Sequence, residues 1–336
     1  MHGKDTALMT TMPGKVARTS SPVLREMLIR AISFVMPLAT LVLMAFFAVN
    51  TKAFLTFDNF AAIISQNAAV IVITAASAML LMAGYVDLSV GSLMGLAGVV
   101  AGLTFLKAGV AAGIFSALAV GFGWGLMNGV LIGIFELSPI VVTLGGLAAA
   151  RGIALALAPK AVYGFPEFVV EFGSGKFLGL GYIGWIALAI AAASIVVMST
   201  TPFGKHILAI GVNQRASFLV GIRVKRAILT LYTLTGLAVA VGAILIVARL
   251  DSAPSGTLGV SMEVTVLTAV LLGGVPFTGG RGSMWRVLLG VWFLTVLRNG
   301  LALMNVGTEF TNIVSGVVLV VAAGLEVLQM YLRQRA

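Results

Sequence analysis

Stretches of about twenty apolar residues recur along the whole chain, and this recurrence limits the fold more than any other feature. A helix needs about 20 such residues to cross the hydrocarbon core of a bilayer. Of the 336 residues, 60% are hydrophobic and 10% are charged, whereas a soluble domain carries about 25% charged residues. The apolar runs also lack the two-residue alternation of an outer-membrane barrel. The sequence therefore predicts an all-α polytopic membrane protein.

The apolar stretches divide into about ten predicted transmembrane helices. They cover residues 28–49, 60–83, 92–106, 110–134, 139–158, 182–200, 228–250, 262–275, 284–304 and 309–330. The first follows a long basic tail and is interpreted as an uncleaved span rather than a signal peptide. The third and the eighth look short, and we expect them to be partial or broken. Asp58 or Asn59 is expected to cap the second span, and residues 251–261 are expected to form an outer loop.

The basic residues lie in the tail 1–27, in the central loop 201–227 and in the tail 331–336. Lys and Arg are retained on the cytoplasmic side, so ten spans place both tails and the loop on the cytoplasmic side of the membrane, around a transmembrane domain at 28–330. This distribution accounts for the net charge of +10 without nucleic acid. The chain has no cysteine and two distant histidines, so we expect no metal and no cofactor.

The central loop contains a predicted short helix at 213–221. Asn213 suits the N-cap position, and Gly221 stands near the end of the helix. Phe218, Leu219 and Ile222 give the helix an apolar face. Because this loop interrupts the apolar spans on the predicted cytoplasmic side, we expect it to be the contact for a cytoplasmic partner that moves the membrane domain.

Asp87, in the sequence GYVDLSVGS at 84–92, is the most unusual residue for a membrane domain. A buried unpaired carboxylate costs several kcal/mol, so Asp87 must face a polar cavity, a partner or the membrane interface. The turn is interpreted as a hinge on the translocation path, with a capping turn at the membrane edge as the alternative. The polar residues proposed for the path are Gln66, Asn67, Asp87, Ser89, Asn128, Thr143, Asn299 and Asn312. Helix–helix hydrogen bonding is their alternative role.

Two halves of the chain share a pattern that indicates an inverted internal repeat, with chance similarity as the alternative. The first span of each half ends at an Asp-containing turn, at Asp87 and at Asp251. The last span of each half begins with a similar string, at 136–146 and at 309–318. One half starts from outside and the other from inside.

Glycines recur every fourth residue at Gly121, Gly125, Gly129 and Gly133, and we interpret this stripe as a helix-packing face. Nucleotide-binding motifs are missing. The sequence GSGK at 173–176 lacks the flanking residues of a P-loop, and GLGYIG at 179–184 opens a membrane span rather than a strand-turn-helix unit. If transport is driven by ATP, the hydrolysis must occur on another chain.

Four ordered blocks, at 83–102, 137–155, 201–224 and 271–303, resemble the permease subunits of carbohydrate ABC importers of the ribose, xylose and galactoside type. The resemblance runs from about residue 30 to the C-terminus. It implies a fold similar to that of the large ABC importers, with about ten helices. It also implies two permease subunits in the bilayer (identical or related), cytoplasmic ATP-binding subunits and a periplasmic substrate-binding protein.

The same resemblance implies that the central loop holds the helix that couples the permease to the ATPase. The coupling residues would be Asn213, Arg215, Ala216, Ser217, Phe218 and Gly221. Importers of this kind carry Glu-Ala-Ala, three residues, then Gly. Here Arg215 replaces the Glu and Ser217 the second Ala, which puts a salt bridge from position 215 in doubt.

Other readings stay open at the level of sequence. The cargo could be an autoinducer sugar derivative, a polyol, a nucleoside or an amino acid. A stand-alone secondary transporter would need a coupling carboxylate, for which Asp87, Glu263 and Glu326 are the candidates. An intramembrane enzyme would need an acid–base or metal set, and no such set is recognisable.

Overall fold

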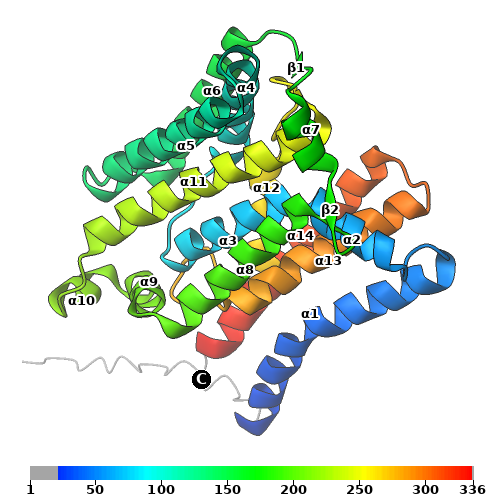
Figure 1. Cartoon of the computed structure of the whole chain (residues 1–336). Coiled ribbons are helices and arrows are strands. Elements are labelled where there is room, and N and C mark those ends of the chain that lie inside the picture. The colour runs from blue at the N-terminus through cyan, green and yellow to red at the C-terminus, as the bar shows by residue number, and fades with distance from the viewer. Residues whose placement is uncertain (1–21, 335–336) are drawn as a thin grey trace, which may run out of the picture.

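Helices make up most of the computed structural model, which describes residues 22–334 (Figure 1). The helices of the first half are α1 (Pro22–Asn50), α2 (Phe57–Gln66), α3 (Ala68–Met82), α4 (Val90–Ala108), α5 (Val110–Gly133) and α6 (Pro139–Leu157). Those of the middle are α7 (Glu167–Ser174), α8 (Tyr182–Thr200), α9 (Pro202–Val212), α10 (Gln214–Leu219) and α11 (Val224–Leu250). The last are α12 (Met262–Leu272), α13 (Met284–Leu303) and α14 (Thr308–Gln334).

Within the described residues, six helices are long and apolar enough to cross a membrane, and the bent pair α2–α3 would make a seventh. The polytopic all-α prediction is confirmed, while the count of ten spans stays a prediction. Residues 22–27 and 331–334 were assigned to the tails but continue α1 and α14 as helix. The remaining residues of the two tails, 1–21 and 335–336, lie outside the described part of the chain.

Three expected boundaries were wrong. The second span is not one straight helix, because α2 and α3 meet at Asn67 with a bend of 55°. The cap of α2 is Thr56, whose side chain accepts a hydrogen bond from the Asn59 backbone N–H. The third span is not short, since α4 has 19 residues. The expected short eighth span is confirmed by the 11 residues of α12.

The long helix α11 crosses the bundle and packs against α3, α4, α5 and α7 (Figure 1). The glycine stripe on α5 faces it. A Cβ added at Gly121 would lie 2.3 Å from the Gly236 carbonyl oxygen, and one at Gly125 would lie 2.4 Å from that of Tyr232. Small residues allow two helix backbones to approach this closely in lipid. The packing role predicted for the stripe is confirmed.

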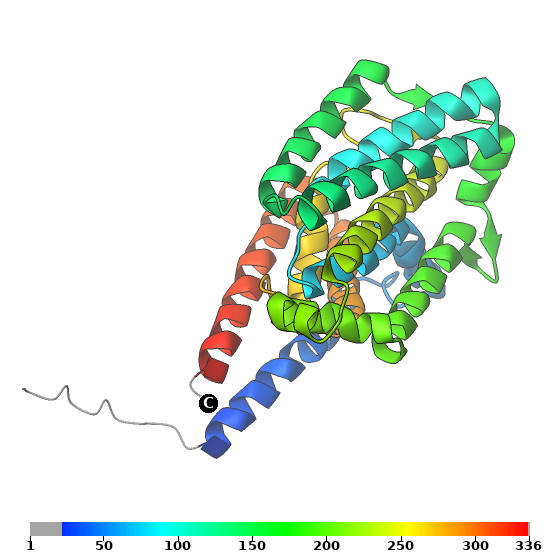
Figure 2. The same ribbon diagram turned by 90° about the vertical axis from the view of Figure 1, so that its left-hand side faces the viewer.

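The two ends of the bundle differ. One end, which we call the α9–α10 end, holds α9, α10 and the first turn of α11, and Figure 2 shows α9 and α10 lying across it. The opposite end holds α7 and two minimal sheets, in which β1 (Val162–Tyr163) pairs with β4 (Ser252–Ala253), and β2 (Lys176–Phe177) with β3 (Leu180–Gly181).

The segment 251–261 is not an outer loop, which corrects the sequence-based assignment. From β4 it runs back along α4, so that Ala253 lies beside Gly102, Leu258 beside Gly98, and Gly259 beside Gly91. That stretch of α4 is about 16 Å long. Side chains at these glycine positions would occupy the space of the segment, so the glycines of α4 make room for it.

A prediction follows from the α5–α11 contact. Gly121→Ala should lower the free energy of unfolding by about 2 kcal/mol, because the added methyl group overpacks a backbone contact. Thermal unfolding of the purified protein in detergent measures the change. Gly123→Ala is the matched control on the same helix, because an added Cβ there meets nothing within 4 Å. Equal melting temperatures for the two variants would contradict this packing.

Candidate functional site

The Asp87 turn begins just after α3 at Gly84, which takes a φ of +84° and donates its N–H to the Leu81 carbonyl. The Asp87 carboxylate is buried and accepts hydrogen bonds from the Ser89 N–H (2.8 Å), the Ser89 hydroxyl (2.6 Å) and the Asn128 amide (3.3 Å). The three residues come from the turn and from α5. The carboxylate is thus kept in the interior by local donors.

Two polar groups beside this cluster have no hydrogen-bond partner within the described chain, although they are buried. They are the Asn128 Oδ1 atom and the Trp124 indole N–H. Gly146 of α6 packs against Ser89 and Trp124, so α4, α5 and α6 meet at this point. An unused acceptor and an unused donor are groups that a buried water molecule can satisfy.

A chain of side-chain contacts joins the turn to α10. The side chain of Gln214, the first residue of α10, lies beside the Tyr85 hydroxyl. The Tyr85 ring meets the ring of Tyr232 edge to face, with centroids 6.4 Å apart, and the Tyr232 hydroxyl donates to the Val86 carbonyl at 2.9 Å. Sequence reasoning missed Tyr232. Its signal was that it is the only aromatic residue in α11.

The helix predicted at 213–221 is confirmed as α10. The Asn213 side chain accepts from the Ala216 N–H at 2.9 Å, and Gly221 takes a φ of +90°. Ser217 is buried, whereas Phe218 is 69% exposed. Leu219 and Val220 are also exposed, so α10 presents apolar side chains to its surroundings.

A groove of about 650 Å³ lies between α10 and the first turn of α11. Half of its lining residues are basic; they are Arg215, Arg223, Lys225 and Arg226. Glu136 is the acidic member, and its carboxylate lies 2.8 Å from the Lys225 ammonium. The hydrogen bond and charge of Lys225 lower the pKa of Glu136. An exposed apolar ridge beside a basic groove is suited to docking a protein with acidic groups.

The other predicted path residues do not join the Asp87 cluster through any side-chain hydrogen bond that the structure gives. Asn299 forms a reciprocal amide pair with Asn59 of α2 (3.1 and 2.9 Å). Thr143 is buried and donates to Pro139 in its own helix. Gln66 and Asn67 lie at the bend between α2 and α3, and the Asn67 amide donates to Ile63. Asn312 is exposed on α14. Of the eight candidates, the structure brings together Asp87, Ser89 and Asn128.

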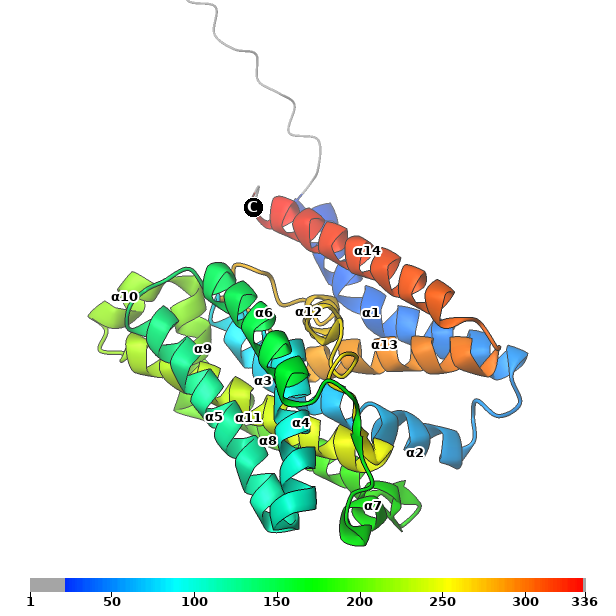
Figure 3. The same cartoon turned by 90° about the horizontal axis from the view of Figure 1, so that it is seen from above.

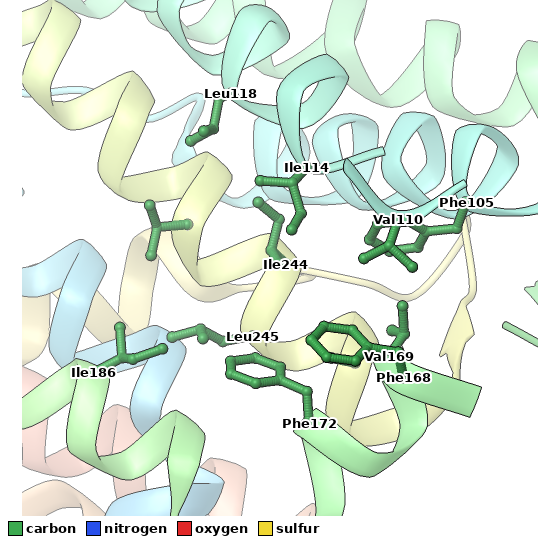
Figure 4. A pocket seen from close by; sticks show the side chains of 12 residues that line it. Phe105, Val110, Ile114, Leu118, Phe168, Val169, Phe172, Ile186, Ile244 and Leu245 are labelled. Atoms are coloured by element: carbon green, nitrogen blue, oxygen red, sulfur yellow. The ribbon is translucent and has the colours of Figure 1, made fainter. Parts of the chain in front are cut away.

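An apolar pocket of about 320 Å³ opens between α4, α5, α7, α8 and α11 (Figure 4). All of its lining side chains are hydrocarbon; they are Phe105, Val110, Ile114, Leu118, Phe168, Val169, Phe172, Ile186, Val241, Ile244, Leu245 and Ala248. These side chains offer no hydrogen bond to a polar solute, so the pocket is not a site for one.

The Asp87 cluster predicts a large loss of stability for Asp87→Ala. The variant leaves buried donors of Ser89 and Asn128 unpaired, which should cost about 2–4 kcal/mol. Thermal unfolding in detergent measures the loss. Asn312→Ala, at an exposed position, should change the free energy of unfolding by less than about 0.5 kcal/mol. Similar effects of the two variants would contradict the assigned hydrogen bonds.

Comparison with known proteins identifies the family. The model described as "Branched-chain amino acid transport system / permease component" matches residues 59–323. No solved structure matches the chain.

Several curated proteins are similar over most of their length. The probable ABC transporter permease protein YphD of Escherichia coli (strain K12) is 32% identical, over 82% of this chain and 83% of its own. The L-arabinose ABC transporter permease protein AraH of Azospirillum brasilense is 32% identical, over 84% of each chain. The ribose import permease protein RbsC of Escherichia coli (strain K12) is 31% identical, over 85% of this chain and 90% of its own. The chain therefore belongs to the family of ABC-importer permease subunits that includes these sugar permeases.

Proposed function

We propose that the chain is the membrane-spanning subunit of an ATP-driven importer for a sugar or a sugar-like solute. The observation that carries the proposal is the exposed apolar surface of α10. This surface gives a membrane domain of this family a place to bind a separate partner. The similar permeases for arabinose and ribose support a carbohydrate cargo. The neutral donors and acceptors near Asp87 suit such a cargo, because a sugar carries no charge.

The α9–α10 end faces the cytoplasm in this proposal, and the opposite end faces the periplasm. The basic residues of the central loop support this orientation. The partners are cytoplasmic ATP-binding subunits at α10, a periplasmic substrate-binding protein at the α7 end and a second permease subunit in the bilayer. ATP hydrolysis takes place on the ATP-binding subunits.

Movement of α10 would reach the membrane interior through Gln214, Tyr85 and Tyr232. These contacts end at the Val86 carbonyl, next to Asp87. When ATP binding closes the ATPase dimer, the docked α10 shifts and changes the relative stability of the inward-open and outward-open states. The Asp87 turn acts as the hinge for the movement between these two states.

Docking at α10 predicts that Phe218→Asp weakens binding of the ATP-binding subunits at least about tenfold, because a charge replaces an exposed apolar anchor. Affinity pull-down of the ATPase with the tagged permease measures the binding. The control substitutions are to alanine, since Phe115→Asp would place a charge on a membrane helix. Phe115→Ala is the control for Phe218→Ala, because both rings are largely exposed (74% and 69%). Undiminished pull-down by Phe218→Asp would rule out this docking surface.

The contact chain predicts a different defect for Gln214→Ala. The variant removes the polar side chain that lies beside Tyr85 but leaves the apolar ridge of α10 unchanged. The ATPase should still bind, while solute uptake per ATP hydrolysed in proteoliposomes should fall several-fold. Lys205→Ala, at an exposed position of α9 outside the proposed coupling residues, is the control. An unchanged uptake-to-hydrolysis ratio for Gln214→Ala would show that the signal takes another route.

A further inference from the structure

The apolar pocket between α4, α5, α7, α8 and α11 is elongated along the helices that line it. On α5 its lining residues follow one another at every fourth position, at Val110, Ile114 and Leu118, and on α11 they run from Val241 to Ala248. The stretch of α5 from Val110 to Leu118 rises about 12 Å, and one leaflet of the hydrocarbon core is about 15 Å deep. The pocket therefore starts at the α7 end of the bundle and extends over most of one leaflet.

The pocket opens at a surface that faces lipid. Both α5 and α8 are candidate membrane spans, and their side chains line opposite sides of the pocket, with α11 between them (Figure 4). Ile114 of α5 is 38% exposed, and Phe168 of α7 is 65% exposed. Figure 3 shows α14 on the other side of the bundle from α5. The opening therefore lies on a face of the bundle that the bilayer surrounds.

Hydrocarbon is the medium that can fill this space favourably. Water would find no hydrogen-bond partner among the lining side chains, and an empty pocket would lose the dispersion contacts of its walls. Its volume of about 320 Å³ is about twice that of a cavity that holds one benzene molecule, so it has room for roughly a dozen carbon atoms. A helix about 10 Å across would need roughly 900 Å³ over the same length. The pocket thus fits a single hydrocarbon chain and not a helix of a partner protein.

Charged side chains surround the mouth of the pocket. The end of α4 meets the segment before α7 there, since the Phe105 and Phe165 rings lie edge to face with centroids 5.6 Å apart. Lys107, in the last turn of α4, and Glu167, the first residue of α7, are exposed and follow these rings by two residues. Glu171 is exposed one turn further along α7. Both signs of charge are present, so the mouth complements a headgroup that carries a phosphate and an ammonium group.

We propose that the apolar pocket binds a zwitterionic phospholipid, with one acyl chain between α5 and α11, its phosphate at Lys107 and its ammonium group at Glu167. The acyl chain packs against Phe168 and Phe172 and so holds α7 against the membrane helices. The lining includes neither the Asp87 cluster nor α10, so the inference does not depend on the proposed function.

Photolabelling of the full-length wild-type permease in proteoliposomes tests whether the chain enters the pocket. The probe is a phosphatidylethanolamine with a diazirine near the middle of one acyl chain, and peptide mass spectrometry locates the label. Leu118, Val241 and Ile244 are half-buried pocket residues, whereas Phe115 is 74% exposed outside the pocket. We expect the three pocket residues to be labelled at least as strongly as Phe115. Label at Phe115 without label at the pocket residues would overturn the proposal.

A pair of tryptophan variants tests retention of the lipid. Ile114→Trp places a larger ring in the pocket, and Phe115→Trp is the control at the next position of α5, outside the lining. Native mass spectrometry of the permease in detergent counts the bound phospholipids. Blocking two or more methylene contacts of the chain should weaken binding at least about tenfold in Ile114→Trp. Equal retention by the two variants would contradict the pocket site.

Two further outcomes of this experiment are decisive. If Ile114→Trp dissociates a dimer and leaves the lipid count unchanged, a second copy of the chain occupies the pocket and the proposal fails. If Ile114→Trp does not fold, the labelling of the wild-type protein decides the question.

Lys107→Ala tests the headgroup contact, with Lys52→Ala as the control at an exposed lysine of the α1–α2 connection. Loss of one cation beside the phosphate should weaken phospholipid binding about fivefold, and the same mass spectra measure it. Retention unchanged by Lys107→Ala, or a bound free fatty acid in place of a phospholipid, would overturn this contact.

Discussion

Every backbone N–H and C=O group that enters the hydrocarbon core must find a partner within the protein, and this requirement governs the whole structure. It explains why most of the described chain is helical. It also explains the two exceptions. In the turn after α3 the Tyr232 hydroxyl donates to the Val86 carbonyl, and in the segment before α12 Arg151 donates to the carbonyls of Ser255 and Leu258. Irregular backbone is present in the bundle where neighbouring groups satisfy it.

These two irregular segments lead into helices whose first turns contact each other. The Asp87 turn leads into α4 and the segment 251–261 leads into α12, and the first turns of these helices adjoin at Gly91, Gly259 and Glu263. The sequence had placed an Asp-containing break in each half of the chain, at Asp87 and Asp251. The inverted repeat itself stays a prediction. The contact between the two breaks is consistent with such a repeat, because the two irregular segments that could line a path lie next to each other in the bundle.

Much of the fold was predictable because its signals are local. Apolar length identified most helices, the four-residue glycine spacing identified the α5 face that meets α11, and Asn213 with Gly221 marked the limits of α10. The site was harder to predict. A polar residue in an apolar span looks the same in sequence whether it bonds to its own helix, as Thr143 does, pairs across helices, as Asn299 does, or joins a cluster, as Asn128 does.

The sequence by itself determined the class of protein, the positions of most helices, the short helix α10 in the central loop and the family. These depend on apolar length, charge placement and short spacings, which are properties of contiguous residues. Tertiary structure alone decided that Tyr85 and Tyr232 connect α10 to the Asp87 turn, and that residues 251–261 enter the membrane domain rather than lie outside it. A stretch such as DSAPSGTLGVS reads as an outer loop because it is polar and rich in glycine. It can lie inside because the glycines of α4, about 150 residues earlier, leave space for it, and Arg151 of α6 binds its carbonyls.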